Sequence, residues 1–135
     1  MPQENVEIVR TLVAHWNAGD RDLVRSIEYL DPSVQLEGPL SSLTAEPYQG
    51  YRGIERWMRD LDEQFDVWVI QIDDVRQVGE DVLVTATIDA RGRTSGAPLK
   101  MGSACVVDFG SDHRVTRVRI YPSAHEALEA MGLEG

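Results

Sequence analysis

Cysteine is almost absent from this sequence of 135 residues, which contains Cys105 and no second cysteine. A lone cysteine excludes an internal disulfide, and chains without disulfides are typical of a reducing compartment, so we expect a cytoplasmic protein. The first residues, MPQENVEIVR, lack the basic start and the apolar stretch of a signal peptide, which agrees with this expectation. No stretch approaches the roughly 18 apolar residues of a membrane-spanning helix, so we expect no membrane partner.

Basic residues are scarce as well. The chain has 13 Lys and Arg against 23 Asp and Glu, which gives a formal net charge of -10 at pH 7. Nucleic-acid phosphates require a basic face, so this charge argues against a nucleic-acid partner. The hydrophobic fraction of 42% and the charged fraction of 27% are ordinary for a globular protein. We therefore expect one globular domain over residues 1–135, which buries roughly two thirds of its unfolded surface.

Motifs for metals and nucleotides are also missing. His15, His113 and His125 share no metal-ligand spacing, and no carboxylate joins them in a recognisable triad. The chain has no glycine-rich phosphate loop of the usual kinds. We expect neither a metal nor a cofactor.

Apolar residues at helical spacing fill the N-terminal half. They predict a helix over roughly residues 4–17, a second helix from Asp20 that buries Leu23, Val24, Ile27 and Leu30, and a third that follows Gly53. The segment DPSVQLEGP, with Pro32 and Pro39, indicates a short strand between two turns. The segment LSSLTAEPYQGYRG has no period and is expected to be a loop.

The C-terminal half changes to an alternating pattern. VWVIQI, VLVTATID, LKMGSACVVDF and RVTRVRIY predict four long antiparallel strands, with VWVIQI ending at Asp73 and Asp74. Ser123 and Glu126 form a capping box that opens a last short helix. Helices gathered on one face of an antiparallel sheet define the α+β class. We expect a strongly curved, cone-shaped antiparallel sheet with helices packed on its concave face, which leaves an apolar cavity for a ligand.

Six segments of the chain resemble the nuclear transport factor 2-like superfamily and, within it, the SnoaL-like group. They are VAHWNAGDRD, LDPSVQLEGP, YQGYRGIERWM, RGRTSGAPLKM, RVTRVRIY and HEALEAMGL, and they cover nearly the whole chain in order. The resemblance implies the cone-shaped fold. It leaves the activity open, because the superfamily contains isomerases, cyclases, epoxide hydrolases, dehydratases and non-catalytic binding proteins.

The catalytic residues of one branch can be compared position by position. Ketosteroid isomerases of this fold use a carboxylate base on the first strand, with a tyrosine and a protonated acid as oxyanion donors. An alignment on NAGD and on the turn before RVTRV implies that these roles fall on Leu36, Leu12 and Cys105. None of the three residues can perform them.

Two carboxylates elsewhere in the strands, Glu37 and Asp89, are candidate general bases. Glu37 ends the first strand and could stand at the mouth of the cavity, or it is simply an exposed residue at a strand end. Asp89 could line a partly polar cavity, or it forms a surface ion pair with Arg91 or Arg93, which would contribute little.

The expected ligand-binding residues are apolar or aromatic. Trp16 and Trp57 lie on the buried stripes of helices that should cover the cavity, and each indole N–H needs a partner. Cys105 has alanine and valines around it, so we expect an inert wall residue and not a reactive thiol. The predicted lining is Leu12, Trp16, Leu36, Tyr48, Trp57 and Cys105, with Tyr48 in the loop at the mouth.

Arg117, Arg119 and Tyr121 alternate on one face of the last strand, away from Val118 and Ile120. Relatives dimerise through this outer sheet face, so the resemblance implies a homodimer whose interface contains the two arginines and the tyrosine.

Three functions remain open at this point. The first is a protein that binds a small, largely apolar molecule in the cone cavity without a complete catalytic set. The second is an isomerase, polyketide cyclase or dehydratase that acts on an apolar carbonyl compound, with Glu37 or Asp89 as general base. The third is a dimeric interaction module. We favour the first, because such catalysis needs a positioned base and the sequence places none.

Overall fold

The computed structural model describes residues 2–20, 26–38 and 48–132. Leu23, Val24 and Pro39, to which the sequence assigned a helix and a turn, lie outside these ranges. The elements, in chain order, are α1 (Pro2–Asn17), the short helix η2 (Ile27–Tyr29), β1 (Leu30–Glu37), β2 (Tyr48–Gln49), α3 (Gly50–Gln64), β3 (Phe65–Val78), β4 (Asp81–Gly92), β5 (Pro98–Phe109), β6 (Val115–Tyr121) and α4 (Ala124–Ala130).

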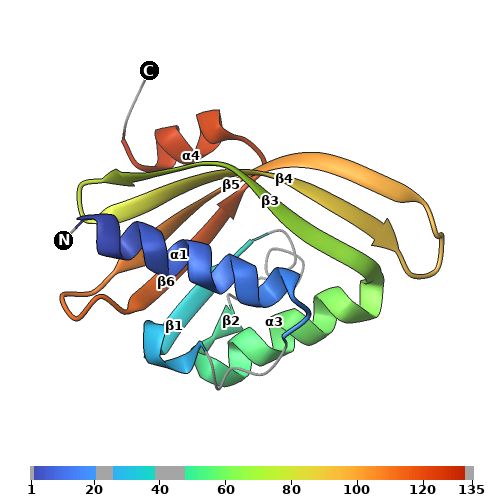
Figure 1. Cartoon of the computed structure of the whole chain (residues 1–135), viewed down its shortest axis with the longest axis horizontal. Coiled ribbons are helices and arrows are strands. Elements are labelled where there is room, and N and C mark those ends of the chain that lie inside the picture. Colours follow the sequence, from blue (N-terminus) through green and yellow to red (C-terminus); the bar gives the residue numbers. More distant parts are fainter. Residues whose placement is uncertain (1, 21–25, 39–47, 133–135) are drawn as a thin grey trace.

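The strands form one curved six-stranded sheet in the order β2-β1-β6-β5-β4-β3, which confirms the predicted α+β class (Figure 1). One pairing differs from the predicted antiparallel pattern, because β1 runs parallel to β6 and the sheet is therefore mixed. The chain passes through α3 and β3 to β5 between these two strands. No hairpin joins them, so nothing forces opposite directions.

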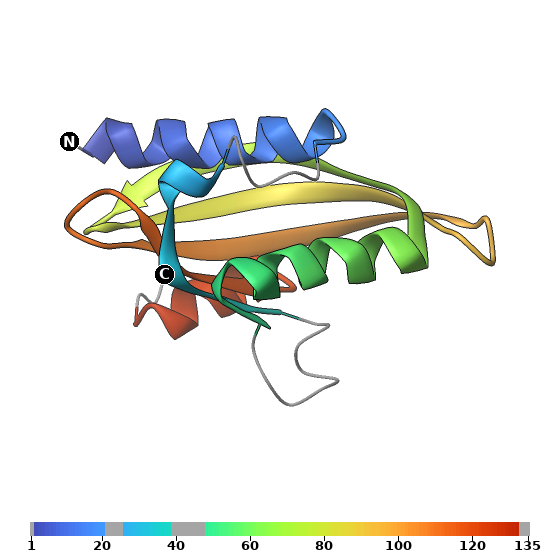
Figure 2. The ribbon, with the colours of Figure 1, turned by 90° about the horizontal axis from the view of Figure 1, so that it is seen from below.

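The helices cover both faces of the sheet. α1 and α3 lie on the concave face, in front of the strands in Figure 2, whereas α4 lies on the opposite, convex face. The sequence placed the helices on one face only. Ala127 of α4 packs with Leu83, Ala104 and Val106 in a small second core, because these sheet residues alternate with the ones that face α1. None of the helices in the described part of the chain is long and apolar enough to cross a membrane.

Gly53 lies inside α3 and does not precede it. The predicted loop over residues 40–53 instead contains β2 and the first turn of α3, which begins at Gly50. A Cβ atom on Gly53 would stand 2.9 Å from the carbonyl carbon of Tyr48. The glycine therefore permits close packing of the helix on β2. From the sequence alone, a glycine with this role cannot be distinguished from one that forms a turn.

Strand β3 continues beyond Asp73 and Asp74, where the sequence predicted its end. The register with β4 shifts between Ile72 and Asp74 because of a bulge, and the pairing then extends to Val78. A bulge admits an extra polar residue without ending the strand.

The end of α1 closes the free edge of β3, the last strand of the sheet. Trp16 Nε1 donates to the carbonyl oxygen of Trp68 at 2.8 Å. Asn17 makes two hydrogen bonds with the backbone of Ile70. Its Nδ2 donates to the Ile70 carbonyl oxygen at 2.7 Å, and its Oδ1 accepts from the Ile70 N–H at 2.9 Å. An unpaired strand edge is a template for aggregation, so these two side chains stand in for a neighbouring strand.

Candidate functional site

A cavity of about 220 Å³ lies between the concave face of the sheet and helices α1 and α3. The wall is almost entirely apolar. All three tryptophans of the chain, Trp16, Trp57 and Trp68, take part in it. A pocket lined by aromatic and aliphatic groups between sheet and helices is the usual form of a small-molecule site.

The floor of the cavity comes from the alternation of β4 and β5. Ala86 and Ser103 lie directly opposite each other in the two strands, and both face the cavity. They are small, whereas the neighbouring Val84 and Ile88 are large. The pair therefore leaves a hollow that the side chains of α1 and α3 do not fill.

Two tryptophans form the helical wall. The rings of Trp16 and Trp57 lie with their centroids 5.4 Å apart and an interplanar angle of 36°. The Trp16 indole N–H is occupied by the carbonyl oxygen of Trp68, so the buried ring presents an apolar surface to the cavity.

The structure brings five of the six predicted lining residues together around the cavity: Leu12, Trp16, Leu36, Trp57 and Cys105. Tyr48 is not among the lining residues. It is buried beneath α3, where its hydroxyl donates to Asp60 Oδ2 at 2.6 Å. Burial, followed by this hydrogen bond, raises the pKa of Tyr48 to about 12. The tyrosine therefore anchors α3 to β2.

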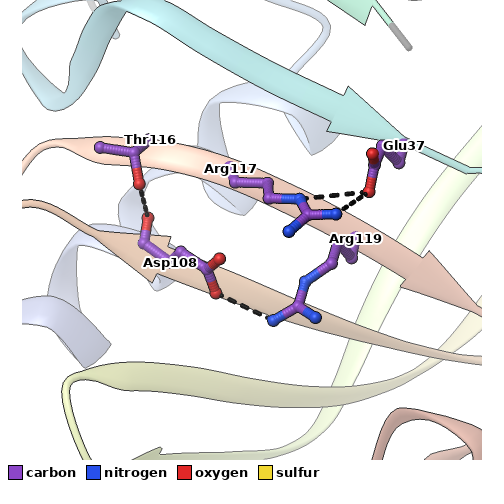
Figure 3. Close-up of polar contacts among 5 residues, drawn as sticks. All are labelled: Glu37, Asp108, Thr116, Arg117 and Arg119. Atoms are coloured by element: carbon purple, nitrogen blue, oxygen red, sulfur yellow. Dashed lines mark hydrogen bonds and ion pairs between the residues drawn. The ribbon is translucent and has the colours of Figure 1, made fainter. Parts of the chain in front are cut away.

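Glu37 lies on the convex face of the sheet, away from the cavity (Figure 3). Its Oε2 accepts from Arg117 Nη2 at 2.6 Å and from Arg117 Nε at 3.2 Å. Leu36 faces the cavity, and successive residues of a strand point to opposite faces, so Glu37 must point outward.

Asp89 lies on the same convex face, because its neighbour Ile88 faces the cavity. Its Oδ1 is 3.9 Å from Lys100 Nζ, the residue opposite it in β5. The predicted partners, Arg91 and Arg93, are not the ones found. Arg93 instead pairs with Asp66 of β3 at 2.8 Å, and its guanidinium also donates to the carbonyl oxygen of Asp62 near the end of α3.

Cys105 lines the cavity directly opposite Val84 of β4. Burial raises the pKa of its thiol from 9.0 to about 12. The thiolate is the nucleophilic form of cysteine, so this environment suppresses its reactivity.

The cavity also has polar wall residues that the sequence did not predict: His15, Asp20, Ser26 and Ser103. His15 Nδ1 lies 3.1 Å from Ser26 Oγ. His15 follows Leu12 by three positions, so it shares the cavity-facing stripe of α1, and this spacing was an available signal. Ser26 carried no signal, because the fold alone brings it to the helix.

Among the described residues, no group of three or more His, Cys, Asp or Glu side chains is placed to hold a metal ion.

The polar cluster on the convex face consists of ion pairs. Besides Glu37 and Arg117, Arg119 Nη2 binds Asp108 Oδ1 at 3.2 Å (Figure 3), and Tyr121 packs beside the second core under α4.

Solved structures share this fold over nearly the full chain. An NTF2-like protein of unknown function from Burkholderia pseudomallei is 17% identical, with a TM-score of 0.77 over 93% of this chain and 95% of that one. A protein with a ketosteroid isomerase-like fold from Catenulispora acidiphila, in complex with trimethylamine, is 16% identical, with a TM-score of 0.73 over 94% and 93%. TerC, co-crystallised with polyporic acid, is 15% identical, with a TM-score of 0.75 over 96% and 98%.

No curated protein matches the chain significantly. The SnoaL-like domain, however, matches residues 9–118, which is most of the sequence. Together with the curved sheet and the cavity beneath α1 and α3, this match shows that the chain belongs to the SnoaL-like domain family.

Proposed function

We propose that this protein binds a small, largely apolar molecule in the cavity between the sheet, α1 and α3. The observation that carries the proposal is the cavity itself, about 220 Å³ in volume and walled mostly by aliphatic and aromatic side chains. A cavity of about 150 Å³ lined in this way stays dry and binds benzene. The larger volume here suits a compound of about two fused rings.

The enzymatic alternative placed a general base in this cavity. Glu37 and Asp89 both leave the sheet on its convex side, and each has a basic partner there. A general base must come within hydrogen-bond reach of the proton that it removes. Neither carboxylate meets this condition for a molecule in the cavity, which argues against both residues as general bases. The carboxylate that does line the cavity, Asp20, already interacts with another group.

Replacing Ala86 with Phe tests the proposal. A phenyl ring on the cavity floor should weaken the binding of 1-methylnaphthalene at least about fivefold, because overpacking of this kind costs about 1–3 kcal/mol. Binding is measured from the indole N–H signals of the three tryptophans in a 1H–15N NMR titration, since all three line the cavity.

Gln71→Phe is the matched control, because this substitution adds the same ring on the exposed outer side of the neighbouring strand, β3. This variant should bind like the wild type, and both variants must unfold cooperatively. Unchanged binding in Ala86→Phe, or no saturable shift in the wild type, would overturn the proposal.

We also propose that the part of the convex face left uncovered by α4 pairs with a second copy of the chain. Arg117 and Arg119 are already neutralised by Glu37 and Asp108, so the face can be buried without leaving these charges unpaired. Gly102 lies exposed in the middle of β5, with open space where a Cβ would stand. Glycine inside a strand often marks a close approach by another backbone.

Gly102→Glu should convert this dimer to a monomer, because it buries a carboxylate without a partner at the interface. Sedimentation velocity distinguishes a particle of twice 15.1 kDa from a single chain of that mass. Ser111→Glu, at an exposed turn between β5 and β6, adds the same charge elsewhere and should remain dimeric. A monomeric wild type, or a dimeric Gly102→Glu variant, would contradict this interface.

A further inference from the structure

One end of the apolar cavity is polar. His15, near the end of α1, and Ser26, just before η2, both line the cavity, and His15 Nδ1 lies 3.1 Å from Ser26 Oγ. Ser26 is buried, with 8% of its surface exposed. Burying polar groups in an apolar wall is unfavourable unless they are hydrogen-bonded, and this contact satisfies one group of each residue.

The position of Ser26 sets its hydroxyl apart from an ordinary helix cap. Ser26 is the N-cap residue of η2, yet its side chain makes no capping hydrogen bond. Serine at such a position usually accepts a bond from a backbone N–H of the first turn. Here the hydroxyl is directed toward His15 instead.

The other polar groups of the wall are distinct from this pair. The Trp16 indole N–H is taken by the carbonyl oxygen of Trp68. Asp20, which also lines this end, already interacts with another group. Ser103 stands apart on the sheet, where it pairs with Ala86 across the ladder. The His15–Ser26 pair is therefore a defined polar element that the binding of an apolar molecule alone does not use.

The hydrogen-bonding capacity of the pair does not depend on the imidazole tautomer. If the serine donates to Nδ1, then Nε2–H remains a donor and the serine oxygen an acceptor. If Nδ1–H donates to the serine, then the serine hydroxyl remains a donor and Nε2 an acceptor. In both cases the pair offers a ligand one donor and one acceptor.

We propose that His15 and Ser26 together bind a hydroxyl group on the ligand, so that the ligand is an apolar compound of about two rings that carries a hydroxyl at one end. A hydroxyl donates and accepts at once, which matches the capacity of the pair, whereas a hydrocarbon would leave it unused. This inference rests on the proposed binding function and assigns the orientation of the ligand, with its oxygen toward the end of α1.

Two probes of nearly equal size test the proposal. 1-Naphthol and 1-methylnaphthalene differ by a hydroxyl in place of a methyl group, and both are titrated by NMR. Ser26→Ala and His15→Phe should each lower the affinity for 1-naphthol by about fivefold, the value of one ordinary hydrogen bond. The affinity for 1-methylnaphthalene should stay within about twofold of the wild type, because the apolar wall is intact.

Two further variants serve as controls. Ser26→Thr keeps the hydroxyl and should retain the wild-type affinity for 1-naphthol. Ser103→Ala removes the isolated serine of the floor and should leave the ratio of the two affinities unchanged.

The outcomes separate this inference from the proposed function. If neither probe binds the wild type, the binding function itself fails. If 1-methylnaphthalene binds but Ser26→Ala and His15→Phe leave the affinity ratio unchanged, or if Ser103→Ala alone changes it, the cavity binds apolar molecules and the assignment of the hydroxyl to His15 and Ser26 is wrong.

Discussion

Replacing Trp16 with Ala is expected to lower the free energy of unfolding by about 3–5 kcal/mol, the usual range for truncating a buried tryptophan. Trp16 is 6% exposed, packs against Trp57 and donates to the carbonyl oxygen of Trp68. Domains of this size are stable by only about 5–15 kcal/mol, so the loss takes at least about a fifth of the total. The midpoint of thermal unfolding should fall by roughly 10–20 °C.

Trp16→Phe separates the two contributions of this residue. The phenyl ring keeps most of the packing but cannot donate to Trp68, so we expect a loss of about 1–2 kcal/mol. Urea unfolding with an unchanged m-value measures both variants on the same scale. A loss below about 1 kcal/mol in Trp16→Ala would mean that the tryptophan neither packs nor bonds as described.

Much of the fold follows from periodicity. The change from a helical to an alternating pattern after α3 is a local property, so it predicted the α+β class and the long strands. The side of the sheet covered by α4 is not local, because Leu83, Ala104 and Val106 come from two strands and form a second apolar face only when they are paired. The parallel pairing of β1 with β6 is equally non-local, since these two strands come from opposite halves of the sequence.

The residues of the candidate site also divide into those that the sequence predicts and those that only the fold brings together. Leu12, Trp16 and Trp57 follow from helical spacing, and Leu36 and Cys105 follow from the resemblance to the SnoaL-like group. The same alternation that places Leu36 inward already requires Glu37 to point outward, so the position of this carboxylate was predictable. The contact of His15 with Ser26 was not, because it joins two segments that have no common pattern.

Cys105 is expected to react with iodoacetamide at pH 8 about 40-fold more slowly in the folded protein than in the protein unfolded in urea. Burial disfavours the anion and raises the pKa of the thiol from 9.0 to about 12, which makes the thiolate about 1000-fold scarcer at this pH. A more basic thiolate is a better nucleophile, and this raises the rate constant of the remaining thiolate about 25-fold. Restricted access through the cavity can only slow the reaction further.

The pH dependence of this alkylation decides between a wall residue and a reactive thiol. Because the pKa lies near 12, the rate in the folded protein should rise about tenfold per pH unit through pH 10, while the unfolded protein levels off above its ordinary pKa. Ser111→Cys in a Cys105→Ser background supplies an exposed thiol on the same folded domain as a reference. A folded-state rate that levels off below pH 8 would show a thiolate stabilised by a neighbouring group, and the cavity would then hold a nucleophile in place of an inert wall.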